Sequence, residues 1–242
     1  MANVVAPHSH ANMPQKIIFF EPHQWSTQAA LLVQEHVGNT MSDNASCSVM
    51  LTGGRSAERL YLEWAKLASF QGQQGVDFYF GDERCVAPDH LESNYGMTMR
   101  TLFSDAAARS NNTIHRMKAD VGDLDSAAQQ YENLLPAKVD VLLLGVGEDG
   151  HIASLFPGDK TWPQEQRCVI PVCCPKPPPQ RLTVTPKVIA GAKAIFVLAT
   201  GPAKAAVLHK AMLNPDNCVS IPACMVLHGT WLLDEALPIT TQ

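Results

Sequence analysis

Residues 139–158 read VDVLLLGVGEDGHIASLFPG, and this stretch indicates the fold class. Its first six residues are mostly apolar, which is typical of a strand buried on both faces of a parallel sheet. The strand runs directly into GVGEDG at residues 145–150, whose glycines have the G-x-G-x-x-G spacing of dinucleotide-binding loops. The stretch therefore predicts an α/β protein with a ligand-binding loop at a strand end, and it leaves the ligand open.

Strand and helix patterns alternate on both sides of this stretch. We expect Gly38 and Asn39 to stop the first helix, and Ser93 and Asp125 to be helix N-caps. Such alternation predicts an α/β fold: a mostly parallel, Rossmann-like sheet with helices on both faces, which binds ligands at the carboxyl ends of its strands. The expected strands lie at residues 16–20, 47–51, 76–80, 114–117, 139–144, 194–199 and 223–227. The expected helices lie at residues 24–37, 57–70, 93–103, 125–135, 186–190 and 203–212.

The composition is that of an ordinary globular protein, with 242 residues, 46% hydrophobic and 17% charged, and a net charge of −5. No block of Lys and Arg is present, so we expect no nucleic-acid partner. The seven cysteines form no C-x-x-C motif, which favours reduced thiols over a zinc ribbon. No apolar run is long enough for a membrane span or signal peptide, so we expect no membrane partner and a cytoplasmic location. Residues 1–15 are expected to form a disordered N-terminal tail, and residues 16–242 a single domain.

The residues after the third glycine argue against a dinucleotide. Pro157 and Gly158 end any helix after about two turns, whereas a dinucleotide loop opens a long helix. Glu165 lies at about the spacing of a ribose-binding acid, but in a loop rather than at a strand end. What remains is His151, whose ordinary pKa of ~6.5 suits a general base, with Asp149 two residues earlier to orient it. A buried structural histidine is the alternative.

Three other expected strand ends carry glycines and charges. TGGRS at residues 52–56 precedes a helix N-terminus, a combination that favours a phosphate group. GDER at residues 81–84 puts three charges directly after a very apolar strand. TGPAK at residues 200–204 puts Lys204 in the first turn of a helix, where the helix dipole disfavours a cation unless an anion is bound nearby. Each loop alone has an ordinary structural explanation, as a turn or a solvated charge.

Together these loops resemble one known family, the 6-phosphogluconolactonases of the oxidative pentose phosphate pathway. The matching segments are LTGGRSAERLY, FYFGDERCVAPDHLESNYGM, DVLLLGVGEDGHIASLFPG, RLTVTPKVI and GPAKAAVL, between residues 51 and 208. The resemblance implies the fold shared with glucosamine-6-phosphate deaminases and ribose-5-phosphate isomerases. It also implies hydrolysis of 6-phospho-D-glucono-1,5-lactone to 6-phospho-D-gluconate, with neither cofactor nor metal.

The glucosamine-6-phosphate deaminases are the nearest alternative family, because they also carry Asp-Gly-His after a glycine-rich strand end. They continue with an Asn-Glu-Pro-Gly pattern, whereas this chain has SLFPG at residues 154–158, the lactonase form. The first loop departs from the lactonase pattern, with TGGRSA at residues 52–57 in place of Ser-Gly-Gly-Ser-x-Pro. This departure leaves it open whether Arg55 contacts phosphate or points to solvent.

The resemblance implies two catalytic residues: His151 takes a proton from the attacking water, and Asp149 orients His151. No G-x-S-x-G elbow is present, so we expect no covalent acyl-enzyme. The phosphate is expected to bind the backbone N–H groups of two glycines, with an arginine and a lysine. A second arginine, Arg84, is expected to contact either the phosphate or the oxyanion, and Asp82 and Asn94 either contact sugar hydroxyls or brace the loops. The expected substrate-binding residues are Gly53, Gly54, Arg55, Asp82, Arg84, Asn94, Arg181 and Lys204.

Two other functions stay open at this point. A sugar-phosphate isomerase or deaminase would use the same fold and similar loops. A non-catalytic sugar-phosphate-binding protein would use the phosphate site alone. In each case the partner is a small phosphorylated sugar, and the resemblance suggests a monomer or weak homodimer.

Overall fold

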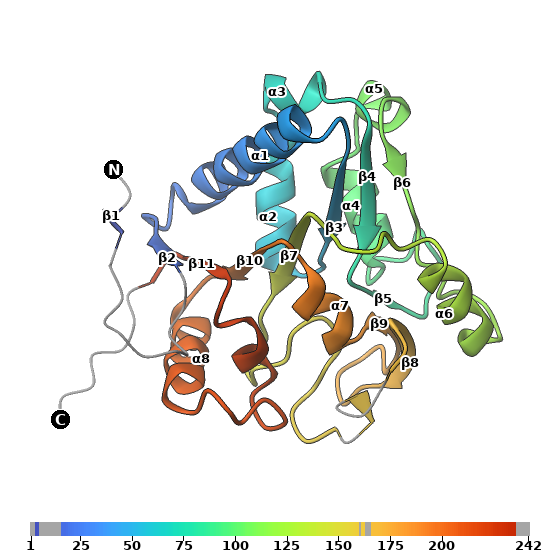
Figure 1. Ribbon diagram of the computed structural model, residues 1–242, viewed down its shortest axis with the longest axis vertical. Helices are drawn as coiled ribbons and strands as arrows, with labels where there is room; N and C mark the ends of the chain where they lie inside the picture. Colours follow the sequence, from blue (N-terminus) through green and yellow to red (C-terminus); the bar gives the residue numbers. More distant parts are fainter. Residues whose placement is uncertain (1–2, 5–15, 160, 163–165, 236–242) are drawn as a thin grey trace.

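The computed structural model of the protein describes residues 3–4, 16–159, 161–162 and 166–235. These residues form two sheets (Figure 1), the larger in the order β1-β2-β11-β10-β7-β3-β4-β6 and the smaller in the order β5-β9-β8. The strands of the larger sheet are β1 (Asn3–Val4), β2 (Lys16–Phe19), β3 (Cys47–Leu51), β4 (Val76–Phe80), β6 (Thr113–Ile114), β7 (Val141–Gly145), β10 (Ala194–Ala199) and β11 (Thr230–Leu233). Those of the smaller sheet are β5 (Asp82–Arg84), β8 (Val169–Cys173) and β9 (Gln180–Val184).

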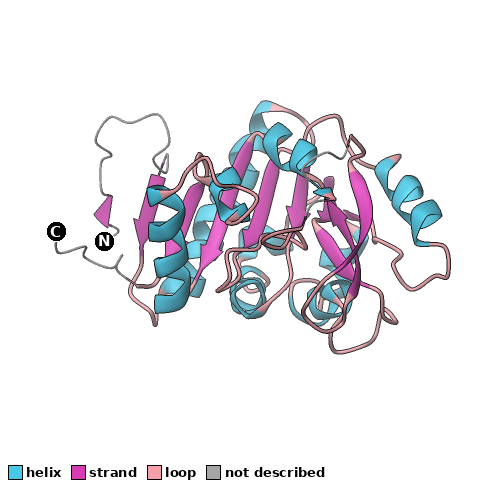
Figure 2. Cartoon of the chain, turned by 90° about the horizontal axis from the view of Figure 1, so that it is seen from below, coloured by secondary structure: helices cyan, strands magenta, loops and turns pink. Residues whose placement is uncertain are grey.

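The helices cover both faces of the larger sheet (Figure 2), as the sequence predicts. α2 packs against both α1 and α4, while α7 and α8 pack on the 3₁₀ helix η2. The helices are α1 (Trp25–Asp43), α2 (Arg55–Trp64), α3 (Ala68–Gln71), α4 (Asn94–Thr101), α5 (Ala106–Ser110), α6 (Leu124–Glu132), α7 (Pro186–Gly191), α8 (Pro202–Leu213) and η2 (Pro222–Val226).

The strands of the larger sheet are parallel from β2 to β6, and β1 pairs with β2 in the antiparallel direction. Parallel strands covered on both faces need continuous apolar runs, and all five residues of β3 are buried. The expected α/β fold with a mostly parallel sheet is therefore confirmed. Because these strands share one direction, the loops after β3, β7 and β10 meet at the same edge of the sheet.

The smaller antiparallel sheet is not evident in the sequence. The charged residues 82–84, expected to be a loop, form β5, which pairs with β9 through Asp82↔Thr183 and Arg84↔Arg181. A three-residue strand with three charges has no hydrophobic period, so pattern analysis cannot detect it. The smaller sheet continues directly from β4 through Gly81, so it stands at the carboxyl edge of the larger one.

Two predictions about secondary structure are wrong: the end of the first helix, and the strand at residues 223–227. The first helix does not stop at Gly38. Instead α1 continues to Asp43, and beyond the glycine Met41 packs against the core. The cost of a glycine inside a helix, about 1 kcal/mol, is small beside such packing. The apolar run at residues 223–227 is the 3₁₀ helix η2 rather than a strand, and the last strand is β11. Short apolar runs do not by themselves distinguish helix from strand.

The helix caps were predicted in part. Ser93 caps α4 as expected, with its side chain accepting a hydrogen bond from the Gly96 N–H. Asp123, not Asp125, caps α6 by accepting from Ser126 N. The expected helix at residues 57–70 is divided into α2 and α3.

Of the expected N-terminal tail, only Asn3–Val4 lie within the described residues, where they pair with β2. Residues 1–2 and 5–15 lie outside them, and the single domain over residues 16–242 stays a prediction. In the ranges that the structure describes, no helix combines the length and apolar character needed to cross a membrane. All seven cysteines lie in these ranges and are free.

Two buried tyrosines satisfy the backbone where central strands end. The hydroxyl of Tyr61 on α2 accepts from Thr52 N and donates to Thr52 O, both at 2.9 Å. The hydroxyl of Tyr131 on α6 accepts from Phe80 N at 2.7 Å. Buried backbone groups without a hydrogen-bond partner are energetically costly. Each tyrosine hydroxyl supplies that partner at the point where the strand ends and the loop begins.

Replacing Tyr61 by Phe removes both hydrogen bonds and leaves two buried backbone groups of Thr52 unpaired. We expect the free energy of unfolding to fall by about 1–3 kcal/mol, measured as a lower urea midpoint with an unchanged m value. Tyr79→Phe is the matched control, because the Tyr79 ring stacks on His115 and its hydroxyl has no hydrogen bond among the described residues. Equal midpoints for the two variants would contradict the role of Tyr61.

Candidate functional site

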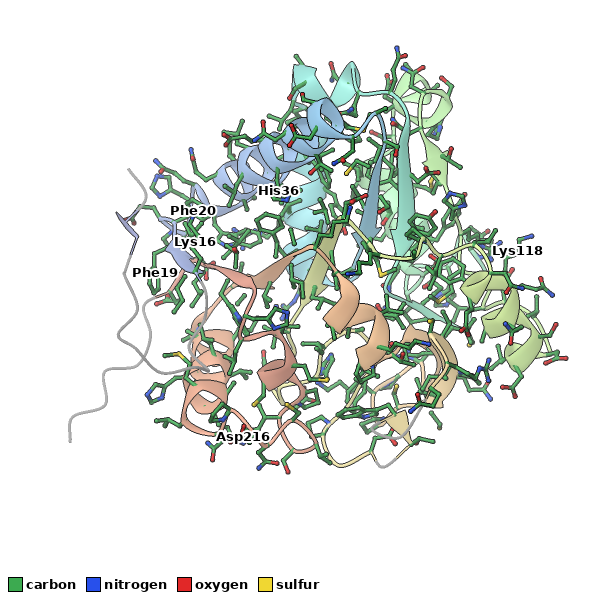
Figure 3. The ribbon with its side chains drawn as sticks, in the orientation of Figure 1. Lys16, Phe19, Phe20, His36, Lys118 and Asp216 are labelled. Atoms are coloured by element: carbon green, nitrogen blue, oxygen red, sulfur yellow. The ribbon has the colours of Figure 1, made fainter. Side chains whose placement is uncertain are left out.

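A cavity of about 370 Å³ opens at the carboxyl edge of the larger sheet. Seven of the ten predicted site residues line it: Gly53, Gly54, Asp82, Arg84, His151, Arg181 and Lys204. A second cavity, of about 440 Å³, lies at the amino ends of β2, β10 and β11, and no predicted site residue lines it. Lys16 and His36, both labelled in Figure 3, line this second cavity. The polar loops of the sequence therefore converge on the first cavity.

His151 and Asp149 form a close pair in the loop after β7. Nδ1 of His151 lies 2.5 Å from Oδ1 of Asp149. The loop is closed by two backbone hydrogen bonds, from Gly147 N to His151 O at 2.8 Å and from Gly150 N to Gly147 O at 2.9 Å. A Cβ on Gly147 would overlap His151 Nδ1 and Asp149 Oδ1, so this glycine makes the room for the pair.

The pair is arranged for an unprotonated imidazole. Burial raises the pKa of Asp149, but hydrogen bonds from Lys176 and His151 outweigh it and lower this pKa to about 2. Burial also lowers the pKa of His151 below its ordinary value of 6.5, against the opposing effect of Asp149. Asp149 is therefore ionised and His151 neutral at neutral pH. Because Nδ1 is held by the carboxylate, Nε2 is the nitrogen available to accept a proton.

Phe156, in the SLFPG stretch, packs on the imidazole ring of His151. Its ring stacks on the His151 imidazole with centroids 4.2 Å apart and an interplanar angle of 18°. Phe156 is 4% exposed, so it shields one face of the imidazole from water. The expected short helix after residue 150 is absent. Instead, bridges join Val146 to Ile152 and Ile152 to Leu155 in a tight loop.

Lys204 lies at the N-terminus of α8, beside that of α2. Its Nζ donates to Ser56 Oγ at 3.0 Å, and Ser56 Oγ is 2.7 Å from Thr200 Oγ1. Neither helix has a side-chain cap, since Gly54 and Gly201 occupy the N-cap positions. Burial lowers the pKa of Lys204, and the positive charge of Arg55 lowers it further. Two helix N-termini and a desolvated lysine favour an anion at this end of the cavity.

Asp82 and Asn94 are braces between loops. The Asn94 amide donates to Asp82 Oδ1 at 3.0 Å, and Ser154 Oγ donates to Asp82 Oδ2 at 2.6 Å. Asn94 is 2% exposed and does not line the cavity, and a Cβ on Gly53 would overlap its amide. For Asn94 the geometry favours bracing over sugar contact, whereas Asp82 braces the loops and also lines the cavity.

The arginines differ in how much of their hydrogen-bonding capacity remains. Arg181 is 4% exposed, and its Nε and Nη2 donate to the carbonyls of residues 176–178. Its Nη1 faces Ser154 Oγ at 3.4 Å. Arg84 Nη1 donates to the Glu92 carbonyl at 2.7 Å. Arg55 is exposed and is absent from the cavity lining, so the solvent alternative is favoured for it.

Sequence reasoning missed three residues that shape the site. Lys176 Nζ lies 2.9 Å from Asp149 Oδ2 and lines the cavity. Ser154 binds Asp82, as described above. The carboxylate of Glu83 accepts from the N–H groups of Asn94 and Tyr95, both at 2.8 Å, at the start of α4. A carboxylate ten residues before an expected helix gives a weak signal for capping. Lys176 gives none, because 27 residues separate it from Asp149.

Among the residues that the structure describes, no three His, Cys, Asp or Glu side chains are grouped so as to hold a metal ion.

The chain is similar to proteins of one family. A model described as glucosamine-6-phosphate isomerases/6-phosphogluconolactonase matches residues 21–233. A 6-phosphogluconolactonase of Mycobacterium tuberculosis is 34% identical over 225 residues, which cover 82% of this chain and 87% of the relative. One of Rattus norvegicus is 31% identical over 236 residues, which cover 90% of each. The solved structure of 6-phosphogluconolactonase from Trypanosoma cruzi has a TM-score of 0.75 and 26% identity, and covers 93% of this chain and 96% of that chain.

These matches confirm the resemblance drawn from the loop sequences. The family model spans far more than half of the chain, and relatives above 30% identity cover more than four fifths of it. The chain belongs to the glucosamine-6-phosphate isomerase/6-phosphogluconolactonase family.

Proposed function

We propose that the protein hydrolyses 6-phospho-D-glucono-1,5-lactone to 6-phospho-D-gluconate, a step of the oxidative pentose phosphate pathway. The observation that carries this proposal is the His151–Asp149 pair in a cavity that also contains Lys204 and two helix N-termini. The substrate has the matching groups, an ester carbonyl to be hydrated and a phosphate dianion to be held. The names of the relatives support the same activity.

In this mechanism His151 Nε2 takes a proton from water as the water oxygen attacks the lactone carbonyl. Asp149 fixes the tautomer with the proton on Nδ1 and stabilises the imidazolium that forms. The C–O bond of the ring then breaks, and the imidazolium returns the proton to the leaving ring oxygen. General-base catalysis contributes about 10²–10⁴-fold, which suits a lactone, an ester that already hydrolyses in water.

The phosphate is held at the ends of α2 and α8. The N–H groups of Arg55, Ser56 and Ala57 start α2, and the Lys204 ammonium adds a full positive charge. Arg181 has only Nη1 directed away from its own loop, so its role toward phosphate rests on that one nitrogen. The contact of Arg84 with either the phosphate or the oxyanion stays a prediction. The cytoplasmic location, the absence of nucleic-acid partners and the state of monomer or weak homodimer also stay predictions.

The test of the function is a pH-stat assay with freshly prepared 6-phosphogluconolactone, run beside the unphosphorylated lactone. We expect hydrolysis well above the spontaneous rate for the first and little for the second. Ammonia release from glucosamine 6-phosphate, in place of lactone hydrolysis, would indicate the deaminase reaction. Equal rates with both lactones would contradict the phosphate site.

Replacing His151 by Ala removes the proposed base, and we expect the catalysed rate to fall by about 10²–10⁴-fold. The matched control is His115→Ala, because His115 also pairs with an aspartate, Asp77, at 2.8 Å but does not line the cavity. We expect that variant to stay within twofold of the original kcat. A His151→Ala protein that keeps its rate within twofold would exclude His151 as the base.

The pKa of His151 can be measured directly by following its imidazole resonance by NMR without substrate. The resonance is assigned as the one missing from His151→Gln. Because burial disfavours the charged form, we expect a midpoint below 6.5, so the base is lost only as the pH falls through that lower value. A midpoint above 6.5 would show that Asp149 outweighs burial.

Replacing Lys204 by Ala tests the phosphate site. The ammonium contacts the phosphate equally in ground and transition states, so we expect KM to rise about 10- to 100-fold, equivalent to ~1.5–3 kcal/mol, with little change in kcat. Lys210→Ala, at the exposed end of the same helix, is the control and should leave KM unchanged. A large fall in kcat at constant KM would move Lys204 to the reacting carbonyl.

A further inference from the structure

The tip of the β8–β9 hairpin brings a cation to the catalytic pair. Lys176 Nζ lies 2.9 Å from Asp149 Oδ2, while Asp149 Oδ1 lies 2.5 Å from His151 Nδ1. The two oxygens of one carboxylate are therefore divided between an ammonium and an imidazole. The smaller sheet supplies Lys176 and the larger sheet supplies the other two residues, so the contact joins the two sheets at the cavity.

We propose that Lys176 is a positioning residue that acts on His151 through Asp149, so that the three side chains form a Lys176–Asp149–His151 triad. A carboxylate bound through one oxygen can rotate and exchange its partner for water. With Oδ2 bound to an ammonium, Asp149 is held with Oδ1 toward the imidazole, and the His151 tautomer is fixed. The effect on catalysis rests on the proposed function, but the contact itself does not.

The backbone that carries Lys176 is held in place by its own hairpin. Arg181 Nη2 donates to the Lys176 carbonyl at 3.2 Å, and Arg181 Nε donates to the Pro178 carbonyl at 3.0 Å. Cys174 N donates to the Pro179 carbonyl at 2.7 Å. Three successive prolines at residues 177–179 further restrict the chain. The base of the lysine side chain is therefore fixed although its ammonium is half-exposed.

Phe156 gives the ammonium a second contact. Lys176 Nζ lies 5.7 Å from the centroid of the Phe156 ring, and that same ring stacks on His151. A cation over an aromatic face is attracted to it, so this contact favours the lysine conformation that reaches Asp149. The lysine thus meets both groups that touch the imidazole.

The charges around His151 make Lys176 the cation that can serve this role. Arg181 donates to the Pro-rich loop and Lys204 donates to Ser56 Oγ, and neither contacts Asp149 among the described residues. Burial lowers the pKa of His151, Asp149 and Asp82 oppose this, and the positive charge of Lys176 lowers it further. The other charged side chains that line the cavity are Asp82, Arg84, Glu148, Arg181 and Lys204.

The first test follows the tautomer of the neutral His151 imidazole by ¹⁵N NMR in Lys176→Met, without substrate. Without the ammonium, Asp149 is free to turn away from Nδ1, so we expect the tautomer with the proton on Nδ1 to lose its predominance. Lys176→Arg keeps the cation and should leave the tautomer as it is in the original protein. Lys66→Met is the matched control, because Lys66 forms an ion pair with Glu63 at 2.7 Å on a remote exposed surface. It should change nothing.

The second test is the kinetics of lactone hydrolysis by the same variants. We expect Lys176→Met to lower kcat about 3- to 10-fold with KM within twofold, and Lys176→Arg to restore kcat to within twofold. A rise in KM at constant kcat would overturn the proposal, because it would assign Lys176 to substrate binding. An unchanged His151 tautomer in Lys176→Met would overturn it as well. If the original protein has no lactonase activity, the proposed function fails, whereas the ¹⁵N measurement still decides whether Lys176 acts on His151 through Asp149.

Discussion

The hydrogen bond from Ser154 to the buried carboxylate of Asp82, 2.6 Å long, is the contact on which the site depends. Asp82 begins the smaller sheet, and Ser154 lies in the loop that presents His151. The same carboxylate accepts from Asn94, whose amide packs against Gly53 in the first loop. A carboxylate that is only 4% exposed must find such partners, so the requirement to satisfy one buried charge aligns three loops from distant parts of the sequence.

The charge distribution of the cavity is opposite to that of the whole chain. The protein carries a formal net charge of −5, yet four basic and two acidic side chains line the cavity. Such a local excess of positive charge attracts anions into a site that the overall field would disfavour. Part of this basic charge is committed to the protein itself, in the Arg181 contacts with its loop and the Lys176 contact with Asp149. Arg84 and Lys204 also donate within the protein, to the Glu92 carbonyl and to Ser56 Oγ.

The central strands of the larger sheet could be predicted from the sequence, whereas its last strand β11 and the smaller sheet could not. β3, β4, β7 and β10 are apolar runs followed by glycine or polar residues, so pattern alone identifies them and the shared edge where their loops meet. β5 is three charged residues long, and its existence depends on pairing with a strand about 100 positions later. Helix α1 passes through Gly38, and the packing of Met41 on the core beyond it offsets the low helix propensity of the glycine.

The site, like the fold, could be predicted from the sequence only in part. The sequence predicts His151, Asp149 and Lys204 because they follow strand ends, where the direction of the chain places them at the ligand edge. Asn94 was assigned an ambiguous role because sequence does not show whether an amide faces a ligand or a neighbouring carboxylate. Phe156 stacks on the imidazole from a loop whose sequence is helix-like, and Lys176 contacts Asp149 from a hairpin tip. Neither contact is evident from sequence spacing.

The environment of Gly147 shows why the glycine pattern at residues 145–150 occurs in this protein. In a dinucleotide site, the second glycine of this spacing admits a pyrophosphate. Here the space that a methyl group would fill is taken by the protein's own imidazole and carboxylate. The glycine pattern thus shows only that space is needed beside the backbone. It does not show whether a cofactor or a side chain fills that space. Sites with unrelated chemistry can share one glycine spacing, because each needs a residue without a side chain at the same positions. Only the neighbouring residues distinguish one kind of site from another.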